Sequence, residues 1–326
     1  MAEIFAISPV RLDVSLVIPV LNESETISSL IETIKAQTLR PSEVIFVDAD
    51  STDNTVEVIE KLSGGQFTII KAGKRVMPGQ GRNIGVASAR YEWIAFTDAG
   101  ILLDKNWLMN LVRKAAEVND ASIIYGDYAP VINSFFDKCC AITFVPGAKP
   151  GHIRGTSIAS CLLKKEVWEK AGGFPSWRAA EDLMFMEKVG KLGFKTAYAP
   201  EAKIYWKLRP NLASAYKKFE VYSKYNVLAG RQRYWHYGVA RQYAVVLAVI
   251  LLGIFHHYYW LFLLPLWIIA RVVKRTYAHR YEFRVKEIFN PFTFFGVMLI
   301  TFVMDAGTFS GWIKALFARD STFKRE

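Results

Sequence analysis

The sequence contains little cysteine, with only Cys139, Cys140 and Cys161 among 326 residues. Three cysteines exclude a disulfide scaffold, and no Cys-x-x-Cys pair is present that would indicate a zinc site. We therefore expect reduced thiols, as in a cytosolic compartment. Charged residues are also few, at 22%, whereas hydrophobic residues make up 52%. This composition excludes a disordered chain and is more apolar than that of an ordinary soluble enzyme.

Acidic residues are outnumbered by basic ones, 30 to 41, which gives a net charge of +11 and favours an anionic partner. The segment from Arg271 to Glu287 contains six Lys and Arg residues and only two Glu residues, and it directly follows an apolar stretch. Such a cluster is typical of a cytoplasmic loop beside a membrane, rather than of a nucleic-acid-binding surface. We predict membrane lipids and no nucleic acid as partners.

The first 235 residues or so alternate short apolar runs with amphipathic ones, which is typical of an α/β domain. Strand–helix–strand units of this length predict parallel pairing, with ligands bound beyond the carboxyl ends of the strands. The expected strands are 14–20, 44–47, 67–71 and 93–97, and the expected helices are 25–37, 55–62 and one that begins within 81–89.

The segment from Tyr243 to Ala270 is almost wholly apolar, which is long for one membrane span of roughly 20 residues and short for two. We predict a helical hairpin over about 237–273 that turns at His256–Tyr259 and returns the basic loop 271–287 to the side of the globular domain. A third apolar segment, about 292–304, either spans, re-enters or lies at the interface, before an interfacial tail. A soluble protein with a long core helix is the alternative, but the amphipathic periodicity it needs is missing. The expected domains are therefore 1–235 and 236–326.

Two carboxylates come directly after predicted strands. Asp48 follows the second strand, where it either accepts hydrogen bonds from the base or ribose of a nucleotide or is a simple turn residue. Asp98 follows the fourth strand and is a candidate hard-oxygen ligand for a divalent ion that bridges a diphosphate.

Two further segments carry charged side chains that could bind phosphate or transfer a proton. KAGKRVMPGQGRN combines Lys74 and Arg82 with three glycines, which indicates either a flexible phosphate-binding loop or a solvated basic loop. Glu181 and Asp182 open an expected helix after a Gly-Gly-Phe turn. They are either partners of the helix dipole or a source of a general base.

Taken together, these segments resemble the family 2 glycosyltransferases. The resemblance covers about residues 13–235 in the family's order and implies a GT-A (Rossmann-like) α/β fold, with a mostly parallel sheet flanked by helices. The apolar segments described above predict that an α-helical transmembrane region follows this fold. The segments that carry it are VSLVIPVLNESETI, VDADSTDNT, GRNIGVASARYEWIAFTDAG and GGFPSWRAAEDLMFMEKVGKLGFKTAYAP.

The resemblance also implies roles for individual residues. Asp182 would be the catalytic base and Asp98 the ligand of a Mg²⁺ or Mn²⁺ cofactor. The chain departs from the family pattern at Ala49, where a second Asp is usual, and at Gly100, which replaces the second Asp of the metal motif. The metal would then depend on Asp98 with water or a distant ligand such as Asp104. The residues expected to bind the nucleotide sugar are Pro19, Asn22, Glu23, Asp48, Asp50, Lys74, Arg82, Asn83, Asp98 and Glu181.

The function implied is that of a membrane-anchored, inverting glycosyltransferase that moves one sugar from a nucleoside diphosphate sugar to a hydroxyl of a lipid-linked or glycan acceptor. The Gln-x-x-Arg-Trp motif of processive synthases is not matched by GRQRYW at 230–235, which favours transfer of a single sugar. We expect a multi-pass protein of the cell membrane with a cytoplasmic catalytic domain. The alternatives are a polyprenyl-phosphate glycosyltransferase, whose acceptor is already an anion, and a catalytically silent membrane-bound member of the family.

Overall fold

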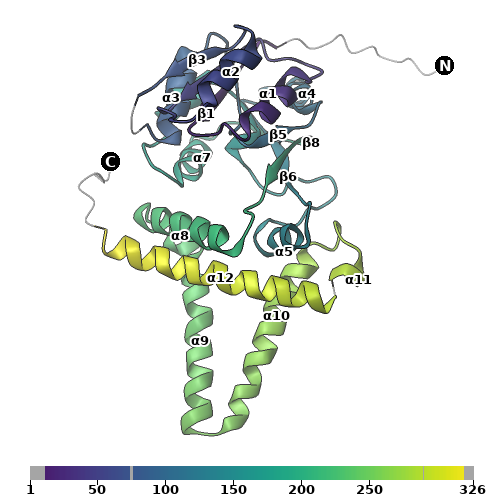
Figure 1. Cartoon of the computed structure of the whole chain (residues 1–326), viewed down its shortest axis with the longest axis vertical. Helices are drawn as coiled ribbons and strands as arrows, with labels where there is room; N and C mark the ends of the chain where they lie inside the picture. Colours follow the sequence, from purple (N-terminus) through teal and green to yellow (C-terminus); the bar gives the residue numbers. More distant parts are fainter. Residues whose placement is uncertain (1–11, 74–75, 289, 319–326) are drawn as a thin grey trace, which may run out of the picture. The chain divides into compact units, whose positions relative to one another are not determined.

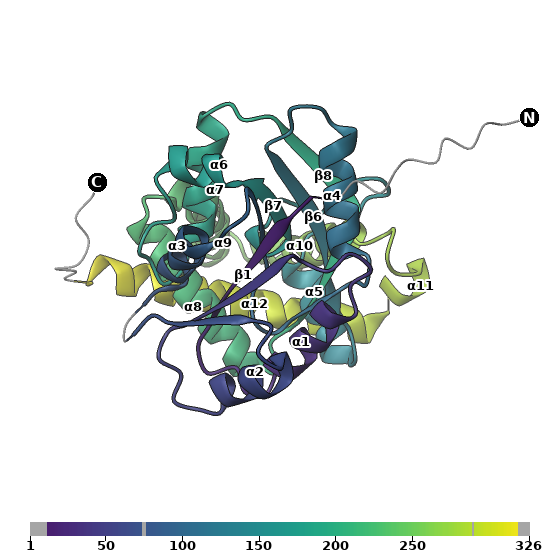
Figure 2. The ribbon, with the colours of Figure 1, turned by 90° about the horizontal axis from the view of Figure 1, so that it is seen from above.

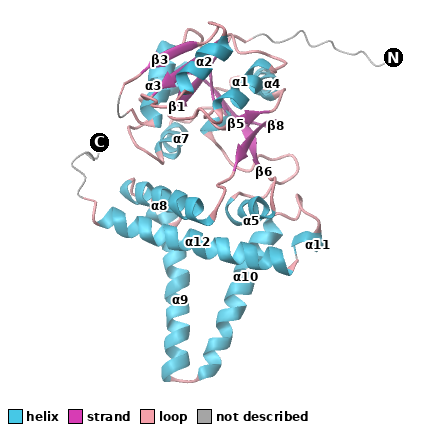
Figure 3. Ribbon diagram, viewed as in Figure 1, coloured by secondary structure: helices cyan, strands magenta, loops and turns pink. Residues whose placement is uncertain are grey.

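The computed structural model describes residues 12–73, 76–288 and 290–318. The chain divides into two compact units, of which the first comprises Met1–Val131 and Lys149–Lys207 and the second comprises Ile132–Ala148 and Leu208–Glu326. Every described strand belongs to the first unit, and the second is helical (Figure 3). The predicted membrane region 236–326 therefore falls within a unit that also takes in 132–148 and 208–235.

The first unit is built on one mixed sheet of eight strands in the order β3-β2-β1-β4-β7-β6-β8-β5. Strands β1 to β4 pair in parallel, as expected, and so do β6 and β8, whereas β7 is antiparallel to both its neighbours. The strands are β1 (Val14–Val20), β2 (Glu43–Asp48), β3 (Thr68–Lys71), β4 (Trp93–Phe96), β5 (Ile101–Leu103), β6 (Ile123–Val131), β7 (Cys161–Lys164) and β8 (Thr196–Lys207).

Helices cover both faces of this sheet (Figure 2). Successive residues of β1 point to opposite faces, so Leu16 and Ile18 enter one apolar core while Val17 enters the other. The continuous apolar sequence of β1 follows from burial on both sides. The helices of the first core are α1 (Ile27–Lys35), α2 (Thr55–Ser63) and α4 (Trp107–Glu117), and those of the second are α3 (Pro78–Ser88), α6 (Lys165–Ala171) and α7 (Glu181–Lys191).

The second unit consists of helices, of which α9 and α10 form a long hairpin and α12 runs across its base beside α8 (Figure 1). An added Cβ at Gly311 would lie 2.2 Å from the carbonyl oxygen of Glu220, so these two helices approach closely. The helices are α5 (Phe135–Phe144), α8 (Leu212–Leu228), α9 (His236–Phe255), α10 (Leu263–Ala278), α11 (Val285–Ile288) and α12 (Pro291–Leu316), with short 3₁₀ turns at Ile158–Ser160, Gln232–Tyr234 and Tyr258–Phe262.

Two helices, α9 and α12, are long and apolar enough to cross a membrane, as judged by length and composition. Helices α9 and α10 lie where the sequence predicts a hairpin, and large apolar side chains are exposed along both, such as Phe255 at 81% and Leu266 at 59%. The cysteines are all free and buried, and burial raises the pKa of the Cys139 thiol to about 11 and that of Cys140 to about 12.

Candidate active site

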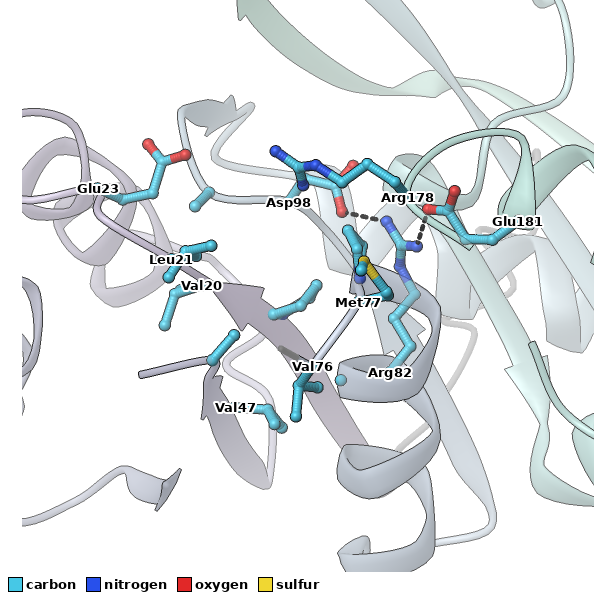
Figure 4. A pocket seen from close by; sticks show the side chains of 15 residues that line it. Val20, Leu21, Glu23, Val47, Val76, Met77, Arg82, Asp98, Arg178 and Glu181 are labelled. Carbon is cyan, nitrogen blue, oxygen red and sulfur yellow. Dashed lines mark hydrogen bonds and ion pairs between the residues drawn. The ribbon is translucent and has the colours of Figure 1, made fainter. Parts of the chain in front are cut away.

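The carboxyl ends of β1, β2 and β4 meet at one edge of the sheet. Val20 pairs with Asp48 in register, and Val17 pairs with Phe96, two residues before Asp98. A cavity of about 260 Å³ opens at this edge (Figure 4). It is lined by Pro19, Val20, Leu21, Glu23, Val47, Ala49, Val76, Met77, Pro78, Gly81, Arg82, Asp98, Ala99, Arg178 and Glu181.

Helix α3 reaches this edge because glycines let it pack closely against β1. An added Cβ at Gly85 would lie 2.3 Å from Cγ1 of Val17, and one at Gly81 would lie 3.2 Å from Cβ of Pro19. At Gly79 the neighbour is the carbonyl oxygen of Pro175, at 2.4 Å. The interpretation of Gly79 as part of a flexible loop is therefore wrong, because Gly79 lies in α3, which begins at Pro78, before the expected helix start at Gly81.

Arg82 holds two acids from distant parts of the sequence. Its Nη2 donates to Asp98 at 2.6 Å and its Nη1 donates to Glu181 at 2.9 Å, as the dashed lines in Figure 4 show. Burial works against the charge of Arg82, but Asp98 and then Glu181 hold its pKa above the ordinary value. Its buried Nε has no hydrogen-bond partner among the described residues. The structure thus brings three predicted site residues together through one buried guanidinium.

The acidic pair at the start of α7 is held in an unusual backbone. Ala180, the residue before the helix, has φ of 68°, a left-handed conformation that is costly for a residue with a Cβ. Burial raises the pKa of both Glu181 and Asp182, against the opposing effect of Arg82. Glu181 is bound by Arg82, whereas Asp182 has no ion pair in the described residues and accepts a hydrogen bond from the backbone N–H of Leu183 at 2.8 Å. Of the two carboxylates, Asp182 is therefore the one that Arg82 does not bind directly.

The loops after β1 and β2 are tied to each other by side chains. The Asn22 carboxamide oxygen accepts from the backbone N–H of Thr52 at 2.8 Å, and the Asp53 carboxylate accepts from the backbone N–H of Ser24 at 3.1 Å. Hydrogen bonds from Thr55 and Ser24 lower the pKa of Asp53 to about 2. Asn22 itself has φ of 55°, which asparagine tolerates better than most residues. These contacts fix the wall of the cavity that carries Leu21 and Glu23.

Asn83 connects α3 to the Gly-Gly-Phe turn. Its Nδ2 donates to the carbonyl of Phe174 at 2.8 Å, and its Oδ1 accepts from the Phe174 N–H and the Trp168 indole N–H, both at 2.8 Å. Every hydrogen-bonding atom of the carboxamide side chain is thus in use on the protein, and Asn83 holds the turn that precedes Glu181.

The predicted donor-binding residues divide into three groups. Five of them line the cavity, namely Pro19, Glu23, Arg82, Asp98 and Glu181. Asn22, Asp48, Asp50 and Asn83 lie outside the lining, and so does the predicted base Asp182; Asp48 accepts from the backbone N–H of Ser51 at 3.2 Å. Lys74 lies outside the described residues.

Arg178 also lines the cavity, and it is not among the predicted site residues. Its side chain reaches over the cavity toward Asp98 (Figure 4). A cation three residues before the acidic pair, in the segment PSWRAAED, was the signal available in the sequence.

The described residues contain no group of three or more His, Cys, Asp and Glu side chains arranged to hold a metal ion. Asp98 supplies a single carboxylate, with one oxygen engaged by Arg82 and 40% of its side chain exposed. Mg²⁺ is commonly held by one or two carboxylates together with substrate phosphates. Asp98 fits that mode of binding, in which the donor itself completes the coordination.

The fold is that of the GT-A glycosyltransferases. The mannosyltransferase PcManGT from Pyrobaculum calidifontis, solved in complex with GDP-Man and Mn²⁺, matches with a TM-score of 0.65 at 16% identity, over 95% of this chain and 88% of that one. In open α/β sheets of this kind, ligands bind in the crevice beyond the carboxyl ends of the strands.

Sequence comparison relates the N-terminal part of the chain to a known family. Residues 15–138 match the model of glycosyl transferase family 2. WfaP of Escherichia coli, a UDP-Glc:alpha-D-GlcNAc-diphosphoundecaprenol beta-1,3-glucosyltransferase, is 24% identical over 221 residues, which are 66% of this chain and 85% of WfaP. The glycosyltransferase GlyG of Streptococcus pneumoniae is 26% identical over 117 residues, which span 35% of this chain and 38% of GlyG. Residues 15–138 thus form a glycosyl transferase family 2 domain, and the predicted resemblance and fold class are confirmed.

Proposed function

We propose that the chain transfers one sugar, with inversion, from a nucleoside diphosphate sugar to a hydroxyl of a lipid-linked or glycan acceptor. The observation that carries the proposal is the arrangement around Arg82, which holds Asp98 and Glu181 at one cavity beside the carboxylate of Asp182. Inversion follows from a single displacement, in which the acceptor oxygen attacks the anomeric carbon opposite the departing diphosphate.

Asp182 acts as the general base in this proposal. Burial raises its pKa, and a carboxylate with a raised pKa is a better proton acceptor near neutral pH. Glu181 is the poorer candidate because Arg82 already binds its carboxylate at 2.9 Å. Asp182 would take the acceptor's proton as the new glycosidic bond forms.

Positive charge is available for the leaving group. Arg178 lines the cavity, so it can approach the diphosphate as negative charge develops there. A Mg²⁺ or Mn²⁺ ion would be held by Asp98, and when bound it would neutralise diphosphate oxygens.

A lipid-linked acceptor is supported by two independent observations. The relative WfaP acts on a sugar attached to diphosphoundecaprenol, and it is matched over 85% of its length. In addition, α9 is long and apolar enough to span a membrane. We propose that the α9–α10 hairpin inserts into the membrane, with the basic 271–287 segment and the catalytic domain on the cytoplasmic side.

Helix α12, unlike the α9–α10 hairpin, does not cross the membrane in this proposal. It runs across the base of the hairpin rather than alongside α9 (Figure 1). Two helices that run crosswise cannot both span one bilayer along its normal. We propose that α12 lies along the membrane surface, with exposed Phe292, Phe295 and Leu316 toward the lipid.

Replacement of Asp182 by Asn tests the catalytic assignment. The matched control is Glu166→Gln, which removes an acid from the exposed ion pair with Lys170 on α6. We expect Asp182→Asn to lower the rate of transfer by about 10²–10⁴-fold while binding of the nucleotide sugar survives. Equal loss of binding and transfer would reassign Asp182 to a structural role. Unchanged transfer would favour a polyprenyl-phosphate acceptor, because an anionic acceptor needs no base.

Hydrolysis of the nucleotide sugar in the absence of acceptor distinguishes an active enzyme from a catalytically silent protein. An active enzyme hydrolyses nucleotide sugar slowly in the absence of acceptor, and this hydrolysis should depend on Mg²⁺ or Mn²⁺. Binding of donor without any hydrolysis or transfer, with either metal, would support the silent alternative.

A further inference from the structure

A second cavity, of about 360 Å³, lies in the helical unit at the C-terminal half of α10. Three cations of this part of the helix, Arg271, Lys274 and Arg275, line it together with Gln242 of α9 and His279. None of these residues belongs to the cavity that carries Arg82 and Asp98. The helical unit therefore has a basic cavity of its own.

The positive charge of this cavity is only partly neutralised. Arg271 forms an ion pair with Asp305, from Nη1 to Oδ2 at 2.7 Å. Arg275 donates to the carbonyl of Thr143, and neither Arg275 nor Lys274 has an acidic ion-pair partner in the described parts of the chain. The acid nearest His279 is Glu282, which its Nδ1 contacts at 2.7 Å. The charges of Lys274 and Arg275 are therefore available to bind an anionic ligand.

Close packing contacts hold the elements that line this cavity. The loop after α5 contacts the end of α10 so closely that an added Cβ at Gly147 would lie 2.0 Å from the carbonyl oxygen of Ala278. The guanidinium of Arg271 lies over the ring of Trp267, with its carbon 4.9 Å from the ring centroid. These contacts hold the cavity in shape before any ligand binds.

The cavity also lies where the exposed side chains of the hairpin change from apolar to basic. Toward the hairpin tip the exposed side chains are apolar, such as Val245 on α9 and Leu266 and Ile269 on α10. Helix α10 rises about 1.5 Å per residue, so Lys274 lies about 12 Å along the helix from Leu266. Cations at this level of an inserted hairpin face the headgroup region, where they meet lipid phosphates.

We propose that this cavity binds the phosphate group of an anionic membrane lipid, which Lys274 and Arg275 neutralise. The proposal rests on the membrane insertion proposed above and not on the glycosyl transfer reaction. The lipid tail would lie along the apolar surface of the hairpin. A free phosphate ion has the same charge but lacks this second contact, so it should bind more weakly.

The test uses the full chain in detergent, titrated with short-chain phosphatidic acid, with phosphatidylcholine of the same chain length, or with inorganic phosphate. Intrinsic tryptophan fluorescence and thermal shift report binding, and Trp267 lies beside the cavity cation Arg271. We expect phosphatidic acid to bind more tightly than the other two. Lys274→Ala should weaken its binding about fivefold, the effect of one cation at a membrane surface.

Arg280→Ala is the matched control, because it removes an equal charge from the same basic segment and Arg280 does not line the cavity. It should leave binding of phosphatidic acid unchanged. Equal weakening by both variants would overturn the proposal in favour of general surface charge. Inorganic phosphate that binds as tightly as phosphatidic acid would overturn the assignment to a lipid.

Flotation with vesicles of phosphatidylcholine tests the hairpin separately. Lys274→Ala leaves the apolar surface intact, so the variant and the unaltered protein should float equally well. Failure of both to float would refute membrane insertion. Normal flotation combined with unselective lipid binding would refute only the phosphate site.

Discussion

Arg82 and Asp98 form an ion pair of 2.6 Å in which the arginine side chain is 4% exposed and the aspartate side chain 40% exposed. The arginine is thus part of the protein interior, while the carboxylate presents its other oxygen to the cavity. Asp98 can therefore be held in place by the protein and still contact a ligand.

Asp98→Asn should remove the metal-dependent part of donor binding. The variant keeps the shape of the side chain, and Arg82 keeps Glu181 as a partner. We expect affinity for the nucleotide sugar in Mn²⁺ to fall by about 10–100-fold, the usual effect of losing a charged contact. Calorimetric titration in Mn²⁺ and in EDTA measures this. An equal loss of affinity in EDTA would argue that Asp98 binds the donor without a metal.

The pH dependence of transfer should report the raised pKa of Asp182. A base must be ionised to accept a proton, so the rate should fall as acid is added at a pH above the ordinary aspartate value of 3.8. A group whose pKa is raised by folding stabilises the folded state at low pH and loses this contribution as the pH rises through the raised pKa. Asp182→Asn should therefore leave the melting temperature at neutral pH unchanged or higher. A lower melting temperature would contradict the assignment.

Gly85→Ala should destabilise the first unit. The new Cβ would lie 2.3 Å from Val17, so α3 must shift away from β1, at a cost of about 1–3 kcal/mol. Gly190→Ala on α7 is the control, because an added Cβ there meets nothing within 4 Å. Chemical denaturation of both variants gives the comparison, and the control should be as stable as the unaltered protein or more so.

Asn83→Ala should loosen the turn that leads to Glu181. It leaves the backbone of Phe174 and the indole of Trp168 without their partners, which should cost about 1–3 kcal/mol in the free energy of unfolding. Asn110→Ala removes a single exposed hydrogen bond to the carbonyl of Glu201 and should cost less. Similar losses in the two variants would argue against a structural role for Asn83.

Charged substitutions near the hairpin tip should weaken membrane binding. Ile254 is 66% exposed and Phe255 is 81% exposed, so aspartate at both positions would carry charge into the lipid. We expect flotation with vesicles to decrease while binding of the nucleotide sugar stays unchanged. Leu192→Asp is the control, because Leu192 is an exposed apolar residue directly after α7 in the first unit. Equal loss of flotation in the control would indicate general aggregation.

The part of the fold with local sequence signals was predictable. The apolar run of β1 gave its bounds, Val14–Val20, and the parallel pairing followed from the strand–helix–strand spacing. The membership of 132–148 in the helical unit was not predictable, because it depends on contacts such as Gly147 with Ala278, far apart in the sequence. Periodicity in one segment contains no information about such partners.

The position of an acid after a strand indicated only part of the cavity lining. Asp98 lines the cavity, whereas Asp48, which also follows a strand, lies outside the lining. Gly79 was expected in a flexible loop, but it is needed for close packing of α3. The sequence alone does not distinguish a glycine needed for packing from one needed for flexibility. Arg178 was overlooked because its position over the cavity depends on the course of an irregular segment before α7.

The buried cysteines have a practical consequence for studies of topology. Thiol reagents attack the thiolate, and in all three cysteines burial raises the pKa and so suppresses ionisation. The native chain should thus give almost no background with maleimide probes. In the variant Tyr258→Cys, an impermeant maleimide would then react only from the side of a sealed vesicle to which the hairpin tip is exposed, and the native cysteines need not be replaced first.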